Sequence, residues 1–168
     1  MKKRILLSLI ISLIYTVGKS QTASVEKSTY GIQTGLLGIW VHNEMKLTNQ
    51  IALRTEFGVN ASIFGGNFYP KTGFLMTPVI SVEPRWYYNL EKRLSKSKSI
   101  SGNSGNFVSL QTSYHPDWFV ISNYDNLKTF NLITIIPTWG IKRNIGKHFT
   151  YETSIGVGYG YQFRGEYD

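Results

Sequence analysis

Cysteine is absent from this 168-residue chain, so neither a disulfide framework nor a thiolate metal site is available to it. Long apolar runs are scarce as well. The longest, Ile5–Val17, falls short of the about 20 residues that a helix needs to cross a bilayer. Amphipathic helical periods and tandem repeats are also missing. These absences exclude disulfide-stabilised scaffolds and helical membrane proteins, and they leave extended structure as the main source of stability.

The first residues have the organisation of a secretory signal peptide. A basic start, Met1–Arg4, precedes the apolar run, and Gly18-Lys19-Ser20 places small residues where a signal peptidase cleaves. We expect residues 1–20 to be removed before Gln21, which leaves 148 of the 168 residues, enough for one domain over residues 21–168. Loss of the leader's four cations lowers the formal net charge from +8 to +4, which does not indicate a nucleic-acid partner.

Alternation of apolar and polar residues is the main pattern of the remaining chain. From Phe149 to Arg164 every second residue is apolar or aromatic, apart from Thr153, and the residues between are polar or glycine. The segments Ile51–Ile63 and Met76–Asn89 repeat this alternation. A strand that lies between lipid and a polar lumen has two such unlike faces.

Turn-type residues separate the extended segments and predict an all-β fold. Pro78 and Pro84 remove ladder donors, so we expect weakened pairing or bulges in their strand. The apolar face of the first segment changes near Gly35 or Gly38, which predicts a bulge there. Six segments are recognisable: Tyr30–Leu47, Ile51–Ile63, Met76–Asn89, Asn106–Tyr114, Phe130–Asn144 and Phe149–Arg164.

The lengths of the connections orient the strands, since outer-membrane barrels have short periplasmic turns and longer outer loops. Thr48-Asn49 is then periplasmic, and Gly65–Gly73 and His115–Leu127 face outward. With six strands in this orientation, both ends of the chain would lie on the extracellular side, whereas such barrels keep both chain ends in the periplasm. We therefore expect an antiparallel up-and-down transmembrane β-barrel of eight strands, with its opening strand within Thr22–Ser28 and its closing strand missing beyond Asp168.

A family resemblance rests on three stretches: the leader that ends in Ser-Gln, the run Glu-Pro-Arg-Trp-Tyr-Tyr-Asn-Leu at Glu83–Leu90, and Ser-Gly-Asn-Ser-Gly-Asn-Phe from Ser101. With them the chain resembles small outer-membrane β-barrel proteins of Bacteroidota over nearly all of its mature part. The resemblance implies a place in the outer membrane of a Gram-negative cell, among outer-membrane lipid and lipopolysaccharide. Ser154–Tyr161 is similar to the signal that the barrel-assembly machinery reads during insertion, although Glu166-Tyr167-Asp168 departs from the family's closing strand.

Charged residues on the polar faces predict an ion-pair network inside the barrel. An eight-stranded interior is just wide enough to be filled by side chains, so we expect these charges to plug the lumen. The alternative is a polar lining for a solute. Lys142 and Arg164 can join either arrangement. The residues of the expected network are Arg54, Glu56, Glu83, Arg85 and Glu152.

Enzymatic activity is the alternative from another class, because some small outer-membrane barrels hydrolyse or transfer lipid acyl chains. Ser113, His115 and Asp117 are the candidate residues. They share one face of one strand, but successive same-face residues lie about 7 Å apart, too far for a direct proton relay. We therefore expect no enzyme, no catalytic residue, no metal site and no cofactor, and we interpret His42 and His148 as turn or interfacial residues.

The outer loop after His115 is rich in aromatic residues, and Trp118, Phe119 and Tyr124 are candidates for contact with an extracellular partner. They can instead extend a strand or join an aromatic girdle. The other expected girdle residues are Trp40, Trp86, Tyr87, Tyr88 and Trp139.

A secreted lipocalin-like barrel is the third possibility, but its core would be inside and its surface charged. Here the larger apolar face of the segments carries essentially no charged residue, which is the reverse arrangement. The sequence thus favours an integral outer-membrane barrel with a structural or surface-interaction role.

Overall fold

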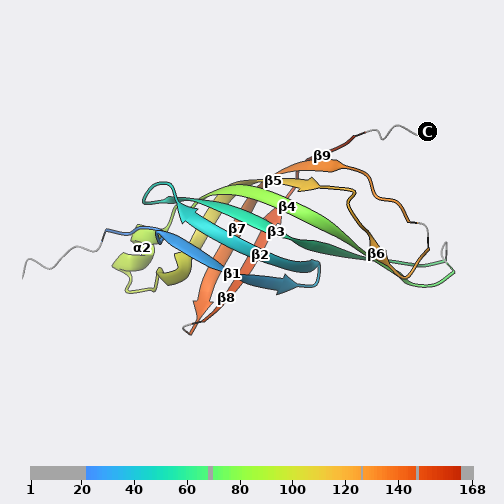
Figure 1. Cartoon of the computed structure of the whole chain (residues 1–168). Helices are drawn as coiled ribbons and strands as arrows, with labels where there is room; N and C mark the ends of the chain where they lie inside the picture. Colours follow the sequence, from blue (N-terminus) through green and yellow to red (C-terminus); the bar gives the residue numbers. More distant parts are fainter. Residues whose placement is uncertain (1–21, 68–69, 126, 147, 164–168) are drawn as a thin grey trace, which may run out of the picture.

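One antiparallel sheet makes up most of the computed structural model, which describes residues 22–67, 70–125, 127–146 and 148–163. The sheet order is β1-β2-β3-β4-β5-β7-β8, with β6 paired to β4 and β9 paired to β7, and the sheet curls into a half-barrel (Figure 1). The predicted all-β antiparallel fold is confirmed. The strands are β1 (Ser28–Gly35), β2 (Gly38–Lys46), β3 (Ile51–Phe64), β4 (Gly73–Trp86), β5 (Gly105–His115), β6 (Ile121–Ser122), β7 (Leu132–Ile145), β8 (Phe149–Gly156) and β9 (Tyr159–Gln162).

The first predicted segment is a hairpin rather than one bulged strand. β1 and β2 pair from Ser28↔Met45 to Gly35↔Gly38, and the chain reverses between them. Gly38 has φ 146°, and a Cβ there would lie 2.1 Å from the carbonyl oxygen of Val59, so the reversal requires glycine. The reversal exchanges the two faces of the chain, which is why the apolar pattern changes there. The opening strand expected within Thr22–Ser28 was therefore placed wrongly, because β1 itself occupies that position in the sheet.

The prolines of β4 weaken pairing on one side only. β3 and β4 pair in one register over their whole length, past Pro78 and Pro84. On the other side of β4, the ladder with β5 is interrupted at Glu83 and Pro84, and Pro78 lies in the gap between the ladders with β5 and β6. The register is the same before and after Pro84, so the predicted weakening is confirmed and no bulge accompanies it.

β8 and β9 are two parts of one strand position. Thr138↔Gly156 and Ile135↔Tyr159 belong to the same antiparallel register, so the chain continues along β7 without an inserted residue. The interruption lies opposite Pro137, which has no amide hydrogen for a ladder. The sixth predicted segment is thus confirmed as far as Gln162, and Arg164 lies outside the described residues, as does the expected signal peptide.

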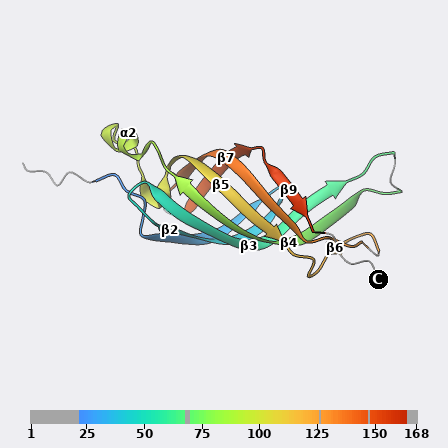
Figure 2. The same cartoon turned by 90° about the horizontal axis from the view of Figure 1, so that it is seen from above.

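The two ends of the sheet differ. At one end, here called the α2 end, the connection between β4 and β5 contains the short helix α2 (Leu90–Ser95) and the 3-10 turn η1 (Ser101–Asn103). At the other end, the loop end, the β3–β4 hairpin extends furthest from α2 (Figure 2). No helix among the described residues is long and apolar enough to span a membrane. A small apolar cluster closes the α2 end and consists of Ala23, Val25, Ala52, Tyr87, Leu90 and Phe107.

Candidate functional site

Charged side chains from five strands meet on the concave face of the sheet. Alternation along each strand turns them inward, and the curl of the sheet brings opposite walls within reach of one another. Most of them are buried, including Arg54 with 1% of its surface exposed and Glu44 with none. We call this group the charge network; its members are Glu44, Arg54, Glu56, Glu83, Arg85, Lys142 and Glu152.

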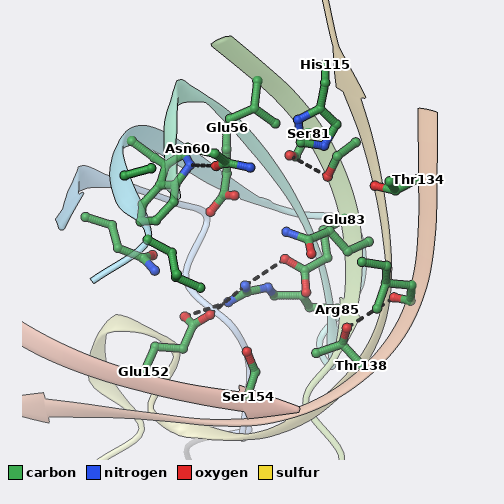
Figure 3. A pocket seen from close by; sticks show the side chains of 18 of the residues that line it. Glu56, Asn60, Ser81, Glu83, Arg85, His115, Thr134, Thr138, Glu152 and Ser154 are labelled. Atoms are coloured by element: carbon green, nitrogen blue, oxygen red, sulfur yellow. Dashed lines mark hydrogen bonds and ion pairs between the residues drawn. The ribbon is translucent and has the colours of Figure 1, made fainter. Parts of the chain in front are cut away.

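Arg85 is the centre of the charge network (Figure 3). From β4 its guanidinium donates to both carboxylate oxygens of Glu152 on β8, at 2.7 and 2.8 Å, and to Glu83 at 2.7 Å. Ser109 of β5 donates to the other oxygen of Glu83 at 2.5 Å. The paired, two-oxygen contact with Glu152 fixes the direction of both side chains and joins opposite walls of the half-barrel.

Arg54 makes a second set of contacts beside Arg85. Its Nε lies 2.5 Å from Glu56 on the same strand, and its Nη1 lies 3.5 Å from Glu152. It also donates to the side-chain oxygen of Gln33 on β1. The sequence predicted an ion-pair network that includes the charged residues of β3 and β4. Within the described residues no ion pair joins these two strands, because Glu83 is already bound to Arg85 and the curl offers Glu152 to both arginines.

Glu44 and Lys142 complete the charge network from β2 and β7. The Lys142 Nζ lies 2.6 Å from a Glu44 oxygen, and the Tyr87 hydroxyl donates to the other oxygen at 2.5 Å. Burial, followed by the negative charge of Glu44, raises the pKa of the Tyr87 hydroxyl well above its usual range, so the hydroxyl remains a donor. Sequence reasoning missed Glu44 because β2 had been merged with β1. The regular alternation of His42, Glu44 and Lys46 was the signal that identified this face.

Phe107 supports Arg85 from the α2 end. The guanidinium carbon lies 4.3 Å from the centre of the Phe107 ring, and the Tyr87 ring packs on Phe107 at 5.6 Å. Gly140 on β7 faces the same ring, and a Cβ there would lie 2.3 Å from the Phe107 Cζ. The position is therefore closed to any larger residue unless Phe107 moves away from Arg85.

Replacing Gly140 with alanine is expected to lower the free energy of unfolding by about 1–3 kcal/mol, because Phe107 is fully buried between Arg85 and Tyr87 and has no space to move into. The measurement is a urea titration in detergent micelles followed by tryptophan fluorescence. Gly160→Ala is the matched control, since a Cβ there meets its nearest atom at 3.5 Å. Equal losses in the two variants would contradict the close packing of Phe107 on β7.

A cavity of about 500 Å³ lies above the charge network, toward the loop end (Figure 3). Four members of the charge network line this cavity: Glu56, Glu83, Arg85 and Glu152. The rest of the wall is formed by uncharged polar side chains with some apolar ones, so the cavity suits water or a small polar solute. Representative wall residues are Gln33, Asn60, Gln111, Ser113, Thr134 and Ser154.

The three candidates for acyl-chain chemistry do not form a relay. Ser113 and His115 both line the cavity, but the Ser113 hydroxyl is hydrogen-bonded to that of Ser81 at 2.8 Å. Asp117 lies beyond the end of β5, and its backbone nitrogen donates to Asn131 at 3.2 Å. In the described part of the chain no hydrogen bond joins Ser113, His115 and Asp117, and no group of three acidic or histidine side chains is placed to hold a metal ion.

Aromatic residues are divided between the two faces. Trp86, Tyr88 and Trp139 form an exposed cluster on the convex face, where the Trp139 indole donates to the Tyr88 hydroxyl at 2.9 Å and the rings of Trp86 and Tyr88 lie 5.9 Å apart. Trp40 and Tyr87 were wrongly assigned to a girdle. Trp40 lines the cavity from the concave face, where its indole donates to an Asn60 oxygen at 2.9 Å, and Tyr87 is buried in the apolar cluster at the α2 end.

The two histidines expected in turns lie in different places. His148 is in the turn between β7 and β8, as predicted. His42 is in the middle of β2, opposite Gly31, and its ring lies against the concave face. The interpretation of His42 as a turn or interfacial residue was wrong, because β1 and β2 had been predicted as one strand.

The aromatic loop residues have two roles. Trp118 and Phe119 are exposed at the loop end. Tyr124 connects the two outer loops instead: its hydroxyl donates to the Lys71 carbonyl at 2.6 Å and accepts from the Lys71 nitrogen at 3.2 Å, and its ring lies 5.4 Å from Phe64. Trp118 and Phe119 thus remain candidates for contact with a partner, whereas Tyr124 holds the loops together.

Replacing Tyr124 with phenylalanine is expected to loosen the two outer loops and to cost about 0.5–1.5 kcal/mol locally, since both hydrogen bonds to the Lys71 backbone are lost while the ring contact remains. Amide hydrogen exchange read by mass spectrometry should show faster exchange in both loops and unchanged exchange in β3. Trp118→Phe is the control, because Trp118 is exposed. Unchanged exchange in the loop that contains Lys71 would contradict the connection.

No family model, curated protein or solved structure matches the chain.

Proposed function

We propose that the protein is an integral outer-membrane β-barrel protein with a structural or surface-interaction role. The observation that carries this proposal is the distribution of side chains between the two faces of the sheet. The buried charges lie on the concave face, and large apolar side chains are exposed along the convex face on every long strand. A water-soluble barrel has the reverse distribution, because its core is inside.

The exposed apolar side chains belong to one continuous surface. Phe57 of β3 pairs with Val41 of β2 on one side and with Ile80 of β4 on the other, and all three point away from the charge network. The exposed cluster of Trp86, Tyr88 and Trp139 borders this surface. Aromatic residues with polar tips are typical of the boundary between lipid and water, so they support the same proposal.

The role is structural because the interior is occupied. The charge network crosses the half-barrel from wall to wall, and the apolar cluster with Tyr87, Leu90 and Phe107 closes the α2 end. Contact with a partner is assigned to the loop end, where the large aromatic side chains of Trp118 and Phe119 are exposed.

Quenching of tryptophan fluorescence by brominated lipids tests the proposal. The chain has 4 tryptophans, so single-tryptophan variants are made by replacing the other three with phenylalanine. In vesicles with bromine near the headgroups, the variant that keeps Trp139 should be strongly quenched, because Trp139 lies on the convex face. The variant that keeps Trp40 should be quenched several-fold less, because Trp40 faces the cavity.

Each outcome of this experiment decides between the alternatives. Quenching of Trp139 alone supports the membrane-embedded sheet. Equal quenching of both residues would contradict the proposed orientation of the two faces. A chain that remains in the aqueous phase, with neither residue quenched, would favour the lipocalin-like alternative.

A further inference from the structure

The connection between β4 and β5 gives the α2 end an excess of positive charge. Glu91 is its one acidic residue, against the four cations Lys92, Arg93, Lys96 and Lys98. The connections at the loop end, residues 65–72 and 116–131, are balanced instead, and their charged residues are Lys71, Lys128, Asp117 and Asp125. The two ends of the sheet therefore differ in charge as well as in structure.

A further arginine reaches the α2 end on the convex face. β7 ends and β8 begins at the same end of the sheet as α2 (Figure 1). Arg143 follows Trp139 and Ile141 at alternate positions of β7, so it shares their convex face, where it lies opposite Tyr151 of β8. This is the face that the proposed function assigns to lipid, and the inference rests on that proposal.

Arg93 of α2 and Arg143 of β7 lie near one another. Burial, followed by the positive charge of Arg143, lowers the pKa of the Arg93 guanidinium, and the nearby Tyr151 side chain has the opposite effect. Within the described residues neither arginine forms an ion pair with a carboxylate. Two guanidinium groups without an acidic partner attract an anion, and each offers N–H donors in a fixed fork.

Neutral acceptors hold both arginines in place. Arg93 donates to the Ser99 carbonyl through Nη2 at 2.7 Å and through Nε at 3.2 Å. Arg143 donates through Nη1 to the carbonyls of Gly105 and Lys142, at 2.7 Å each. These bonds fix the side chains without cancelling their charge. They also leave the Arg93 Nη1 and the Arg143 Nε for a ligand.

Tyr88 adds a hydroxyl donor and connects the arginines to the exposed aromatic cluster. Its oxygen accepts from the Trp139 indole at 2.9 Å and from the Asn106 amide nitrogen at 3.3 Å, so its own hydrogen is left for another acceptor. The Asn106 amide oxygen accepts from Arg143. Asn106 thus joins Arg143 to Tyr88, and Trp139 lies one hydrogen bond further along the convex face.

The chemistry of the donors selects an anionic lipid headgroup. Phosphate oxygens accept from guanidinium forks and from hydroxyl groups, and the exposed apolar surface beside the donors suits acyl chains. A zwitterionic headgroup would bring an ammonium group close to Arg93, Arg143 and the lysines of the connection, which repel it. A headgroup with a net negative charge has no such cost.

We propose that Arg93, Arg143 and Tyr88 bind the phosphate group of an anionic phospholipid. Its acyl chains lie on the convex face beside Trp139 and Ile155, which pair across β7 and β8. The exposed lysines of the β4–β5 connection contribute a general attraction to negative charge, whereas the two arginines and the tyrosine contact the phosphate directly.

Competition between lipids beside Trp139 tests the site. The full chain with Trp139 as its single tryptophan is reconstituted in vesicles of phosphatidylglycerol and phosphatidylcholine, with bromine on the acyl chains of one lipid at a time. Quenching of Trp139 then gives the ratio of the two affinities. We expect phosphatidylglycerol to be preferred by roughly tenfold and Arg93→Gln to reduce this preference roughly fivefold, the effect of one cation beside an anionic lipid surface.

Lys92→Gln and Lys96→Gln are the matched controls, because each removes one exposed cation from the same connection. Both should retain most of the preference. Arg143→Gln should lose as much of it as Arg93→Gln. Since Arg143 also holds the β5 backbone at Gly105, Arg93→Gln decides the test if Arg143→Gln does not fold.

The outcomes separate the possible explanations. Equal losses in Arg93→Gln and Lys92→Gln would overturn the site in favour of general attraction to a charged surface. Inorganic phosphate should leave the preference unchanged relative to chloride at equal ionic strength; its abolition by phosphate would assign the site to free phosphate instead. Quenching of Trp139 in vesicles of brominated phosphatidylcholine alone tests the membrane assignment. Its absence would overturn the proposed function, whereas quenching without a preference between lipids would overturn the headgroup site alone.

Discussion

Replacing Arg85 with methionine is expected to destabilise the protein by about 3–5 kcal/mol, the largest single effect that we predict. Methionine keeps most of the side-chain volume but removes the charge. Glu83 and Glu152 then lose their shortest cation contacts, at 2.7 Å each, and Glu83 has only 2% of its surface exposed. An uncompensated carboxylate in a buried site costs far more than the ion pair itself contributes.

The measurement is the urea midpoint of unfolding in detergent micelles, and a triple variant provides the control. Glu83→Gln and Glu152→Gln remove the carboxylates that Arg85→Met leaves without a partner, so the triple variant should recover a large part of the lost stability. Lys92→Met, at an exposed position of α2, should change stability by less than about 1 kcal/mol. An Arg85→Met variant as stable as Lys92→Met would show that the charge network does not hold the walls together.

Replacing Phe57 with arginine is expected to cost about 2–4 kcal/mol in a bilayer, the second largest effect. Phe57 lies in the middle of the 14-residue strand β3, on the convex face, and is 52% exposed. In water an arginine at such a half-exposed position would change the free energy of unfolding very little. A large penalty arises only where lipid surrounds the side chain, so the variant measures the environment of the convex face directly.

Ile63→Arg is the matched control, because Ile63 lies near the loop end of the same strand and points to the same side. Near the boundary with water the penalty falls to about 0–1 kcal/mol. Both variants are unfolded by urea from lipid vesicles, and their free energies are compared. Equal penalties at the two positions would contradict a membrane that is centred on β3.

Alternation of apolar and polar residues predicted the strands wherever a segment of the chain occupies a single strand position in the sheet. The second to sixth predicted segments correspond to β3, β4, β5, β7 and the combined β8 and β9, because a period of two residues is a local property. The prediction for the first segment was wrong because two different features give the same sequence pattern. A two-residue turn, here Leu36-Leu37, and a bulge within one strand both change which residues face the apolar side. Only the pairing of Gly35 with Gly38 distinguishes the two, and pairing is not visible in a linear pattern.

The candidate site was predictable in its composition but not in its contacts. Alternation turned all five predicted network residues inward, and the structure brings all five together. Their partners depend on the curl of the sheet, which carries Glu152 to Arg85 over 67 positions of the sequence and Glu44 to Lys142 over 98. The positions of Trp40 at the cavity and of Tyr87 in the apolar cluster depend on the same curl, since an aromatic residue near a strand end suits either face.

The sequence by itself determined the all-β class, the strand periods and the division into a charged face and an apolar face, because each of these is encoded by neighbouring residues. Only the tertiary structure decided the β1–β2 hairpin, the ion pairs between opposite walls, and the close packing of Gly140 on Phe107. These features depend on the distance between segments that are far apart in the chain, and that distance is set by the curvature of the sheet as a whole.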